Sequence, residues 1–188
     1  MHSHTPQIIH ILGASGSGTS TPGEALQDNC GYKWFDTDDY FWKQTDPPYM
    51  EKRPTEERTA LLAQHMKEHP RCVISGSLCS WGDVFIPQFE MVIFIDTPTD
   101  VRIERLCKRE YERFAERICK GGDMYDEHTE FIAWAKTYDT NHPPERCRKL
   151  HMEWLKDITC PTVYIDGTKP TSEILNQVKT LICDRQIT

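Results

Sequence analysis

The stretch that decides the fold covers residues 8–20 and reads Ile8-Ile9-His10-Ile11-Leu12-Gly13-Ala14-Ser15-Gly16-Ser17-Gly18-Thr19-Ser20. Its first five residues form a near-continuous apolar run, which is typical of a strand buried on both faces of a parallel sheet. The next eight match the frame G-x-x-x-x-G-K-[ST], with Thr19 in the place of the lysine. The stretch therefore predicts a strand, a tight loop and a helix in immediate succession.

The loop at 13–20 has most properties of a phosphate-binding loop. Its glycines allow the backbone to turn with N–H groups inward, and the following helix presents its positive end to phosphates. Ser20 would offer a hydroxyl to Mg²⁺. Thr19 cannot supply the point charge of a lysine, so one electrostatic contact is missing. We expect nucleotide phosphates to contact Gly13, Ala14, Ser15, Gly16, Ser17, Gly18, Thr19 and Ser20. The alternative is an ordinary Gly/Ser-rich turn, which would not explain the frame.

The rest of the chain alternates apolar runs with helical segments. The further runs are Tyr32–Phe35, Cys72–Ile74, Met91–Ile95 and Thr162–Ile165. Helices are predicted at 19–29, 55–68, 98–119, 126–137, 143–157 and 171–183. Strands interleaved with helices predict right-handed βαβ units and a parallel sheet. No internal repeat is visible, so we expect one domain over residues 1–188. The proline-rich stretch at 44–54 is predicted to be a loop.

Composition excludes several classes of protein. The chain has 188 residues and a net charge of -7, which argues against a general nucleic-acid binder. No stretch approaches the roughly 20 apolar residues that cross a bilayer, and Met1–Gln7 does not read as a signal peptide. Eight cysteines without a C-x-x-C pair favour reduced thiols. We therefore expect a cytoplasmic protein without nucleic-acid or membrane partners, either a monomer or a homodimer.

Two carboxylates follow the second apolar run, at Asp36 and Asp38. In open α/β folds, ligands bind at the carboxyl edge of the sheet, where these side chains would lie. Phosphoryl transfer needs an anion beside the metal and a group that positions the nucleophile. The alternative is that Asp36, Asp38 and Asp39 cap the next element or face water. We expect Asp39 to face solvent.

With these motifs the chain resembles the nucleoside monophosphate kinase and shikimate kinase superfamily over most of its length. Order and spacing support the likeness, through Ser75-Gly76-Ser77, Gly121-Gly122 and Asp166-Gly167-Thr168-Lys169-Pro170. The resemblance implies a P-loop NTPase fold with three α/β/α layers and a five-stranded parallel sheet of order 2-3-1-4-5. It also implies an acceptor-binding region at about 37–70, a lid at about 105–140, and ATP and Mg²⁺ as cofactors.

The resemblance assigns roles to individual residues. Asp36 would lie near the metal and its water shell, as would Ser20, and Asp38 would orient or deprotonate an acceptor hydroxyl. Gly167 would belong to a loop whose backbone touches adenine, although a plain strand-to-helix turn is an equal alternative. The chain departs from nucleotide-accepting relatives after the third run, because residues 75–83 contain no arginine. This departure favours an unphosphorylated hydroxyl acceptor.

An arginine series occupies the predicted helix at 98–119. Its members recur at intervals of three and four residues, at Arg102, Arg105, Arg109, Arg113 and Arg117. Interspersed glutamates make a solvated helix with surface ion pairs the simpler interpretation. The resemblance places this helix in the lid, where an arginine could supply the charge that Thr19 lacks. We expect the catalytic arginine to be among Arg109, Arg113 and Arg117.

The sequence thus predicts an ATP-dependent phosphotransferase. Mg-ATP would bind at 13–20, and the γ-phosphoryl group would pass to a small acceptor, either a nucleoside monophosphate or a hydroxyl metabolite. The alternative is a degenerate nucleotide-binding or slow NTPase module that has lost transfer chemistry with its lysine. A nucleotide-independent scaffold is a third and weaker interpretation.

Overall fold

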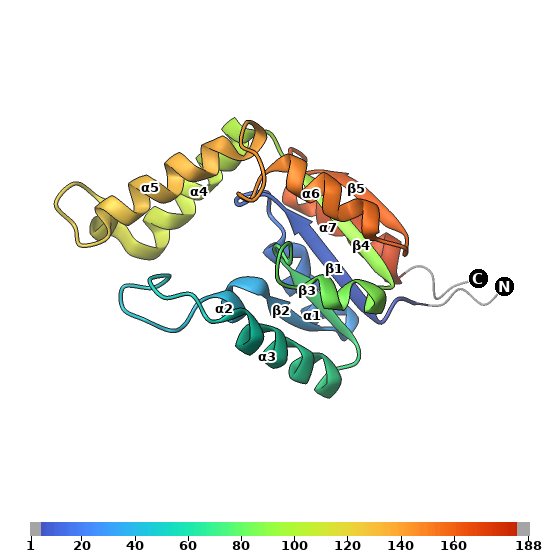
Figure 1. The fold of residues 1–188 in the computed structure, drawn as a ribbon. Coiled ribbons are helices and arrows are strands. Elements are labelled where there is room, and N and C mark those ends of the chain that lie inside the picture. The colour runs from blue at the N-terminus through green and yellow to red at the C-terminus, as the bar shows by residue number, and fades with distance from the viewer. Residues whose placement is uncertain (1–4, 184–188) are drawn as a thin grey trace.

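The structure, a computed structural model, describes residues 5–183 and is built on a five-stranded parallel sheet (Figure 1). The strand order is β2-β3-β1-β4-β5, which confirms the predicted order 2-3-1-4-5. The strands are β1 (Ile8–Gly13), β2 (Lys33–Asp36), β3 (Cys72–Ser75), β4 (Met91–Asp96) and β5 (Thr162–Asp166). β1 lies at the centre, so its residues Ile9, Ile11 and Leu12 are fully buried. The central strand therefore delivers the loop at 13–20 to the middle of the carboxyl edge.

Helices cover both faces of the sheet and make three layers. The α-helices are α1 (Ser20–Cys30), α2 (Thr37–Phe41), α3 (Thr55–Glu68), α4 (Thr99–Phe114), α5 (Tyr125–Lys136), α6 (Arg148–Trp154) and α7 (Thr171–Cys183). Short 3₁₀ helices are η1 (Asp83–Gln88), η2 (Ala115–Ile118), η3 (Thr137–Asp139) and η4 (Leu155–Asp157). On one face α1 and α7 bury Leu26, Ile174 and Val178 against the sheet. On the other, α3, η1 and α6 contribute Leu62, Phe85 and Trp154 to a second core.

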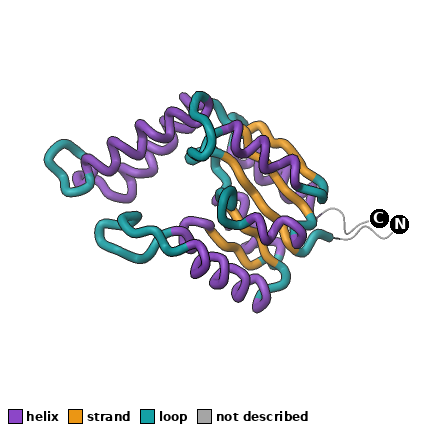
Figure 2. Tube along the Cα trace, in the orientation of Figure 1, coloured by secondary structure: helices purple, strands orange, loops and turns teal. Residues whose placement is uncertain are grey.

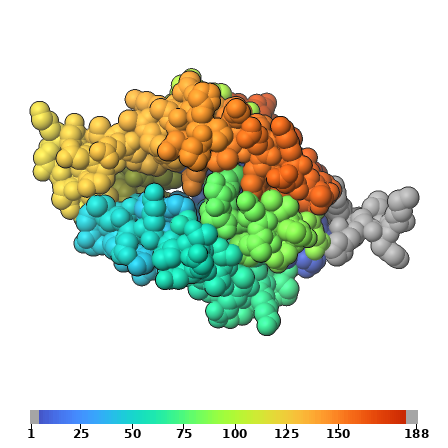
Figure 3. Space-filling view, viewed as in Figure 1, coloured from blue at the N-terminus to red at the C-terminus, as the bar shows by residue number. Residues whose placement is uncertain are grey.

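Two arms extend from the carboxyl edge of the sheet (Figures 1 and 2). One arm spans residues 99–136, and we call it the lid after the region expected at about 105–140; in it α4 and α5 lie side by side around a small core of Leu106, Ile132 and Ala135. The other arm is the loop at 42–54 that follows α2, and we call it the acceptor arm after the region expected at about 37–70. In the space-filling view the ends of the two arms lie against each other over a hollow (Figure 3). Among residues 5–183, no helix is both long and apolar enough to cross a bilayer.

Several boundaries differ from those predicted. The helix expected at 98–119 ends at Phe114 and continues as η2, because Ala115 takes a positive φ of 46°. The helix expected at 143–157 begins only at Arg148, where the side chain of Cys147 accepts a hydrogen bond from Leu150 N and caps α6. Neither α2 nor η1 was predicted, because elements of five or six residues are too short to show a periodic pattern.

Candidate active site

The loop at 13–20 has the geometry of a P-loop. Gly16 and Gly18 adopt φ values of 82° and 94°, which side chains with a Cβ rarely tolerate. Ser17 N donates to Ala14 O at 2.9 Å and closes the turn. Within residues 5–183, the amides of Ser15, Gly16 and Gly18 have no hydrogen-bond acceptor. The loop thus keeps backbone donors available for an anion.

Helix α4 holds the P-loop from the side. A Cβ on Gly16 would come within 2.6 Å of Arg102 O, so only glycine allows this close approach. Arg102 is fully buried, and its guanidinium donates to Ser15 O at 3.1 Å, Thr97 O at 3.1 Å and Ala135 O at 3.2 Å. These bonds give Arg102 a structural role that joins the P-loop to the lid.

The two residues predicted to serve the metal lie together. Ser20 begins α1, and its Oγ donates to Oδ2 of Asp36 at 2.9 Å. The other carboxylate oxygen of Asp36 accepts from Asp38 N at 3.0 Å and caps α2. A hydroxyl beside a carboxylate at the start of a P-loop helix suits Mg²⁺, which takes few protein ligands and fills its remaining positions with phosphate oxygens and water. The residues present therefore fit a magnesium ion that binds with its nucleotide.

Asp38 follows Asp36 into the site. Its side chain is exposed to solvent, and desolvation by the protein atoms around it raises the pKa of its carboxyl. The negative charge of Asp36 raises that pKa further, whereas the positive charges of Arg146 and Arg109 lower it. The exposed side chain of Asp39 faces solvent as expected. Asp38 is thus a carboxylate of raised pKa on which the charges of Arg146 and Arg109 act.

The three arginines selected from the sequence occupy different places along the lid. Arg109 donates to Glu110 at 2.9 Å and acts on Asp38. Arg113 is exposed, and its charge lowers the pKa of Tyr49, which lies in the acceptor arm and whose pKa burial raises. Arg117 donates to Asp123 at 2.8 Å and to Asp46 at 2.9 Å. Arg109 is therefore the member of this set whose charge acts on Asp38.

Two further arginines belong to the site and were not selected. Arg146 acts on the carboxyl of Asp38 and lies over the ring of Trp134, with 5.6 Å between its Cζ and the ring centroid. Arg146 lies in the loop before α6, and no motif in the sequence indicates that this loop packs near Asp38. Arg105 lies beside the P-loop, with Nη1 3.9 Å from the position that a Cβ on Gly18 would take. The sequence shows that Arg105 belongs to the arginine series, but it does not indicate that Arg105 lies beside Gly18.

The loop after β5 also reaches the carboxyl edge next to the P-loop. Gly167 N donates to Asp96 O at 2.7 Å, and a Cβ on Gly167 would lie 1.8 Å from Oγ1 of Thr97. Thr97 in turn donates to Ser17 O at 3.3 Å. Tight packing against Thr97 therefore requires a glycine at position 167, and Thr97 connects this glycine to the P-loop.

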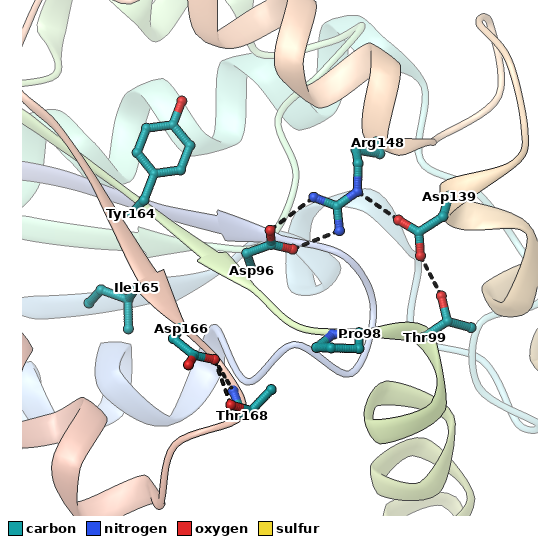
Figure 4. A pocket seen from close by; sticks show the side chains of 9 residues that line it. All are labelled: Asp96, Pro98, Thr99, Asp139, Arg148, Tyr164, Ile165, Asp166 and Thr168. Carbon is teal, nitrogen blue, oxygen red and sulfur yellow. Dashed lines mark hydrogen bonds and ion pairs between the residues drawn. The ribbon is translucent and has the colours of Figure 1, made fainter.

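A separate cavity of about 540 Å³ lies beyond this edge, between β5 and α6 (Figure 4). Arg148 spans it and donates to both oxygens of Asp96, at 2.7 and 3.0 Å, and to Asp139 at 2.7 Å. Asp139 accepts from Thr99 at 2.5 Å. This network fixes the base of the lid to β4, and the cavity includes neither the P-loop nor Asp38.

Comparisons with known proteins agree with this geometry. A family model described as an AAA domain matches residues 9–118. The "Uncharacterized protein YqaC" of Bacillus subtilis (strain 168) is 37% identical over 170 residues, which cover 90% of this chain and 94% of that protein. A shikimate kinase from Acinetobacter baumannii in complex with shikimate has a TM-score of 0.58 at 13% identity, covering 99% of this chain and 97% of the other. A gluconokinase from Sinorhizobium meliloti 1021 has a TM-score of 0.51 at 19% identity, with 96% and 94% covered. These likenesses establish the P-loop small-molecule kinase fold.

Proposed function

The chain belongs to the AAA domain family and has the fold of the P-loop small-molecule kinases, and on this premise we propose that it transfers the γ-phosphoryl group of ATP to a hydroxyl group of a small acceptor. The observation that carries the proposal is the connected series Ser20–Asp36–Asp38. It runs from the P-loop helix through the carboxylate that caps α2 to the carboxyl of increased pKa. Ser20 would serve as a metal ligand, Asp36 as the anion beside the metal and Asp38 as the group that positions the nucleophile.

The donor half of the site would hold Mg-ATP. The free amides of the P-loop would bind the phosphates, and Ser20 and Asp36 would hold the magnesium ion and its water. When bound, Mg²⁺ neutralises part of the charge on the transferred group. Gly167 and its loop would lie against the adenine, since they pack beside the P-loop.

The acceptor half would be centred on Asp38. Its carboxylate would accept a hydrogen bond from the acceptor hydroxyl and take its proton as the oxygen bonds to the γ-phosphorus and the bond to the bridging oxygen of ADP breaks. Desolvation raises the pKa of Asp38 and so makes it a stronger base than an ordinary carboxylate, and the charges of Arg146 and Arg109 oppose part of this rise. The same two cations would neutralise charge that develops in the transition state.

The composition of the loop after β3 favours a hydroxyl metabolite over a nucleoside monophosphate. No basic residue follows Ser75 up to Asp83. This turn is tightly packed, because a Cβ on Gly76 would lie 1.8 Å from Oγ1 of Thr37. The neighbouring structures named for shikimate and gluconate phosphorylation have the same fold, which supports this choice of acceptor. The two arginines beside Asp38 suit an acceptor that carries a carboxylate.

The test is acceptor-dependent formation of ADP with Mg²⁺, over a panel of hydroxy acids, sugar acids, sugars and nucleoside monophosphates. We expect one class of hydroxy acid to stimulate ADP release, and Asp38→Asn to abolish the stimulation while leaving the Kd of Mg-ATP within about threefold. Asp28→Asn, the same chemical change at an exposed position of α1, is the matched control. A chain that binds Mg-ATP but responds to no acceptor would instead be the nucleotide-binding module that the loss of lysine suggests.

A further inference from the structure

The P-loop of this chain contains no cationic side chain, because Thr19 stands at the lysine position and residues 13–20 hold only glycine, alanine, serine and threonine. In a P-loop with lysine, the ammonium group reaches the β- and γ-phosphates and neutralises part of their charge. Backbone amides alone provide dipoles but no full charge. A triphosphate at this loop therefore needs a cation from another element.

Helix α4 lies close enough to the P-loop to supply this cation. Gly16 contacts the backbone of Arg102 so closely that a Cβ would lie 2.6 Å from its carbonyl oxygen and 2.9 Å from Cγ of Leu106. Arg102 also donates to Ser15 O. The first two turns of α4 thus rest on the P-loop.

Arg105 lies on the turn of α4 that passes the end of the loop. Its Nη1 is 3.9 Å from the position of a Cβ on Gly18, the residue immediately before Thr19. Within residues 5–183 its half-buried guanidinium makes no hydrogen bond and no ion pair. By contrast, Arg109 and Arg117 are bound to carboxylates. A half-buried guanidinium with five unused donors is a site for an anion.

We propose that Arg105 takes the place of the missing lysine and that its guanidinium binds the outer phosphates of the nucleotide. The planar fork of Arg105 would contact two phosphate oxygens at once, where a lysine would contribute a point charge. Arg109 follows one turn later, about 6 Å along the helix axis, and acts on Asp38. The two arginines would then flank the path of the γ-phosphoryl group, one on the donor side and one on the acceptor side. This inference rests on the proposed function only in taking a nucleoside triphosphate as the ligand.

Binding measurements test the inference without reference to catalysis. Isothermal titration with Mg-ATP, Mg-tripolyphosphate and adenosine would compare the wild type with Arg105→Gln. We expect Arg105→Gln to weaken both Mg-ATP and Mg-tripolyphosphate by about 10- to 100-fold and to leave adenosine unchanged. Lys108→Gln, an exposed cation on the same helix, is the control and should alter none of the three Kd values.

A second variant, Thr19→Lys, makes the test specific for the lysine role. Introduced alone into the wild type, Thr19→Lys should leave the binding of Mg-tripolyphosphate unchanged or weaken it, because two cations would crowd one site. Combined with Arg105→Gln, it should restore at least tenfold of the lost affinity, and the melting temperatures of both variants would show that they fold. Unchanged tripolyphosphate binding in Arg105→Gln, or an equal effect of Thr19→Lys in both backgrounds, would overturn the inference. A wild type that binds Mg-ATP but lacks transfer activity would contradict the proposed kinase function alone.

Discussion

Arg117 of the lid and Asp46 of the acceptor arm form an ion pair across the mouth of the site, with Nη2 and Oδ1 2.9 Å apart. The pair joins segments 71 residues apart in the sequence. Arg117 also binds Asp123 within the lid, so its guanidinium is held at the tip of that arm. The two arms are thus connected by an exposed, salt-sensitive contact.

Asp46→Asn is expected to loosen this connection. Because the pair is exposed, it adds little to global stability, and the melting temperature should stay close to that of the wild type. Hydrogen–deuterium exchange should become faster at 42–54 and 115–124, and about 1 M salt should produce the same change in the wild type. The control is Glu51→Gln, which removes an ion pair within the acceptor arm. Unchanged exchange in Asp46→Asn would show that the contact does not restrain the arms.

The pH dependence of activity should report on the neighbours of Asp38. The ionised carboxylate is the active form, so kcat/KM should fall at low pH as Asp38 is protonated. Arg146 lowers the pKa of Asp38, and therefore Arg146→Gln should move this acid limb to higher pH. Lys149→Gln, an exposed change on α6, should leave the limb in place. A pH–rate profile of each protein checks the prediction, which fails if the acid limb of Arg146→Gln coincides with that of the wild type.

Asp38→Asn should also stabilise the folded protein. The pKa of Asp38 is raised from its ordinary value of 3.8, so the ionised carboxylate is less favourable in the folded than in the unfolded chain. Stability is therefore lost as the pH rises through the folded-state pKa, and Asn avoids this loss. Urea denaturation should show the variant more stable than the wild type at pH 7, with the difference shrinking toward pH 4. Asp28→Asn on the exposed side of α1 is the control, and a less stable Asp38→Asn protein would contradict the argument.

Arg102→Leu should be strongly destabilising. The change leaves the carbonyl oxygens of Ser15, Thr97 and Ala135 without their donor in a buried site. Each buried acceptor left without its donor costs about 1–3 kcal/mol. Chemical denaturation of the variant measures the cost, with Lys108→Gln as the exposed control. A loss below about 1 kcal/mol would mean that water replaces the guanidinium at little cost.

Acid should destabilise the protein through two buried histidines. Burial lowers the pKa of His151 to about 3 and that of His10 to about 4, so both stay neutral in the folded chain. The unfolded chain takes up protons near pH 6.5, and stability is therefore complete above that value and declines as the pH falls. His151→Gln should reduce the decline between pH 7.5 and 5, with His10 responsible for the remainder. An identical pH dependence in the variant would argue against this origin.

The sequence predicted the fold and indicated that Ser20 and Asp36 would lie at the same edge of the sheet, because both follow from local patterns. Ser20 and Asp36 end up 2.9 Å apart since β1 and β2 both end at the carboxyl edge, on either side of β3. Arg146 could not be found in this way, because its position depends on how the loop before α6 packs against the lid. The arginine series gave the helical phase of Arg105 but not the glycine contact that brings α4 onto the loop. The periodicity of a sequence does not indicate such close contacts between backbones.

The contact between Gly16 and Arg102 also limits how such proteins can be recombined. Because α4 packs against the loop with no room for a Cβ on Gly16, the loop and the helix form one packing unit, in which the helix would supply the cation. Transplanting a lysine-bearing loop from a relative would leave a redundant cation, and transplanting the helix alone would leave a loop with none. A working chimera would have to carry both segments together.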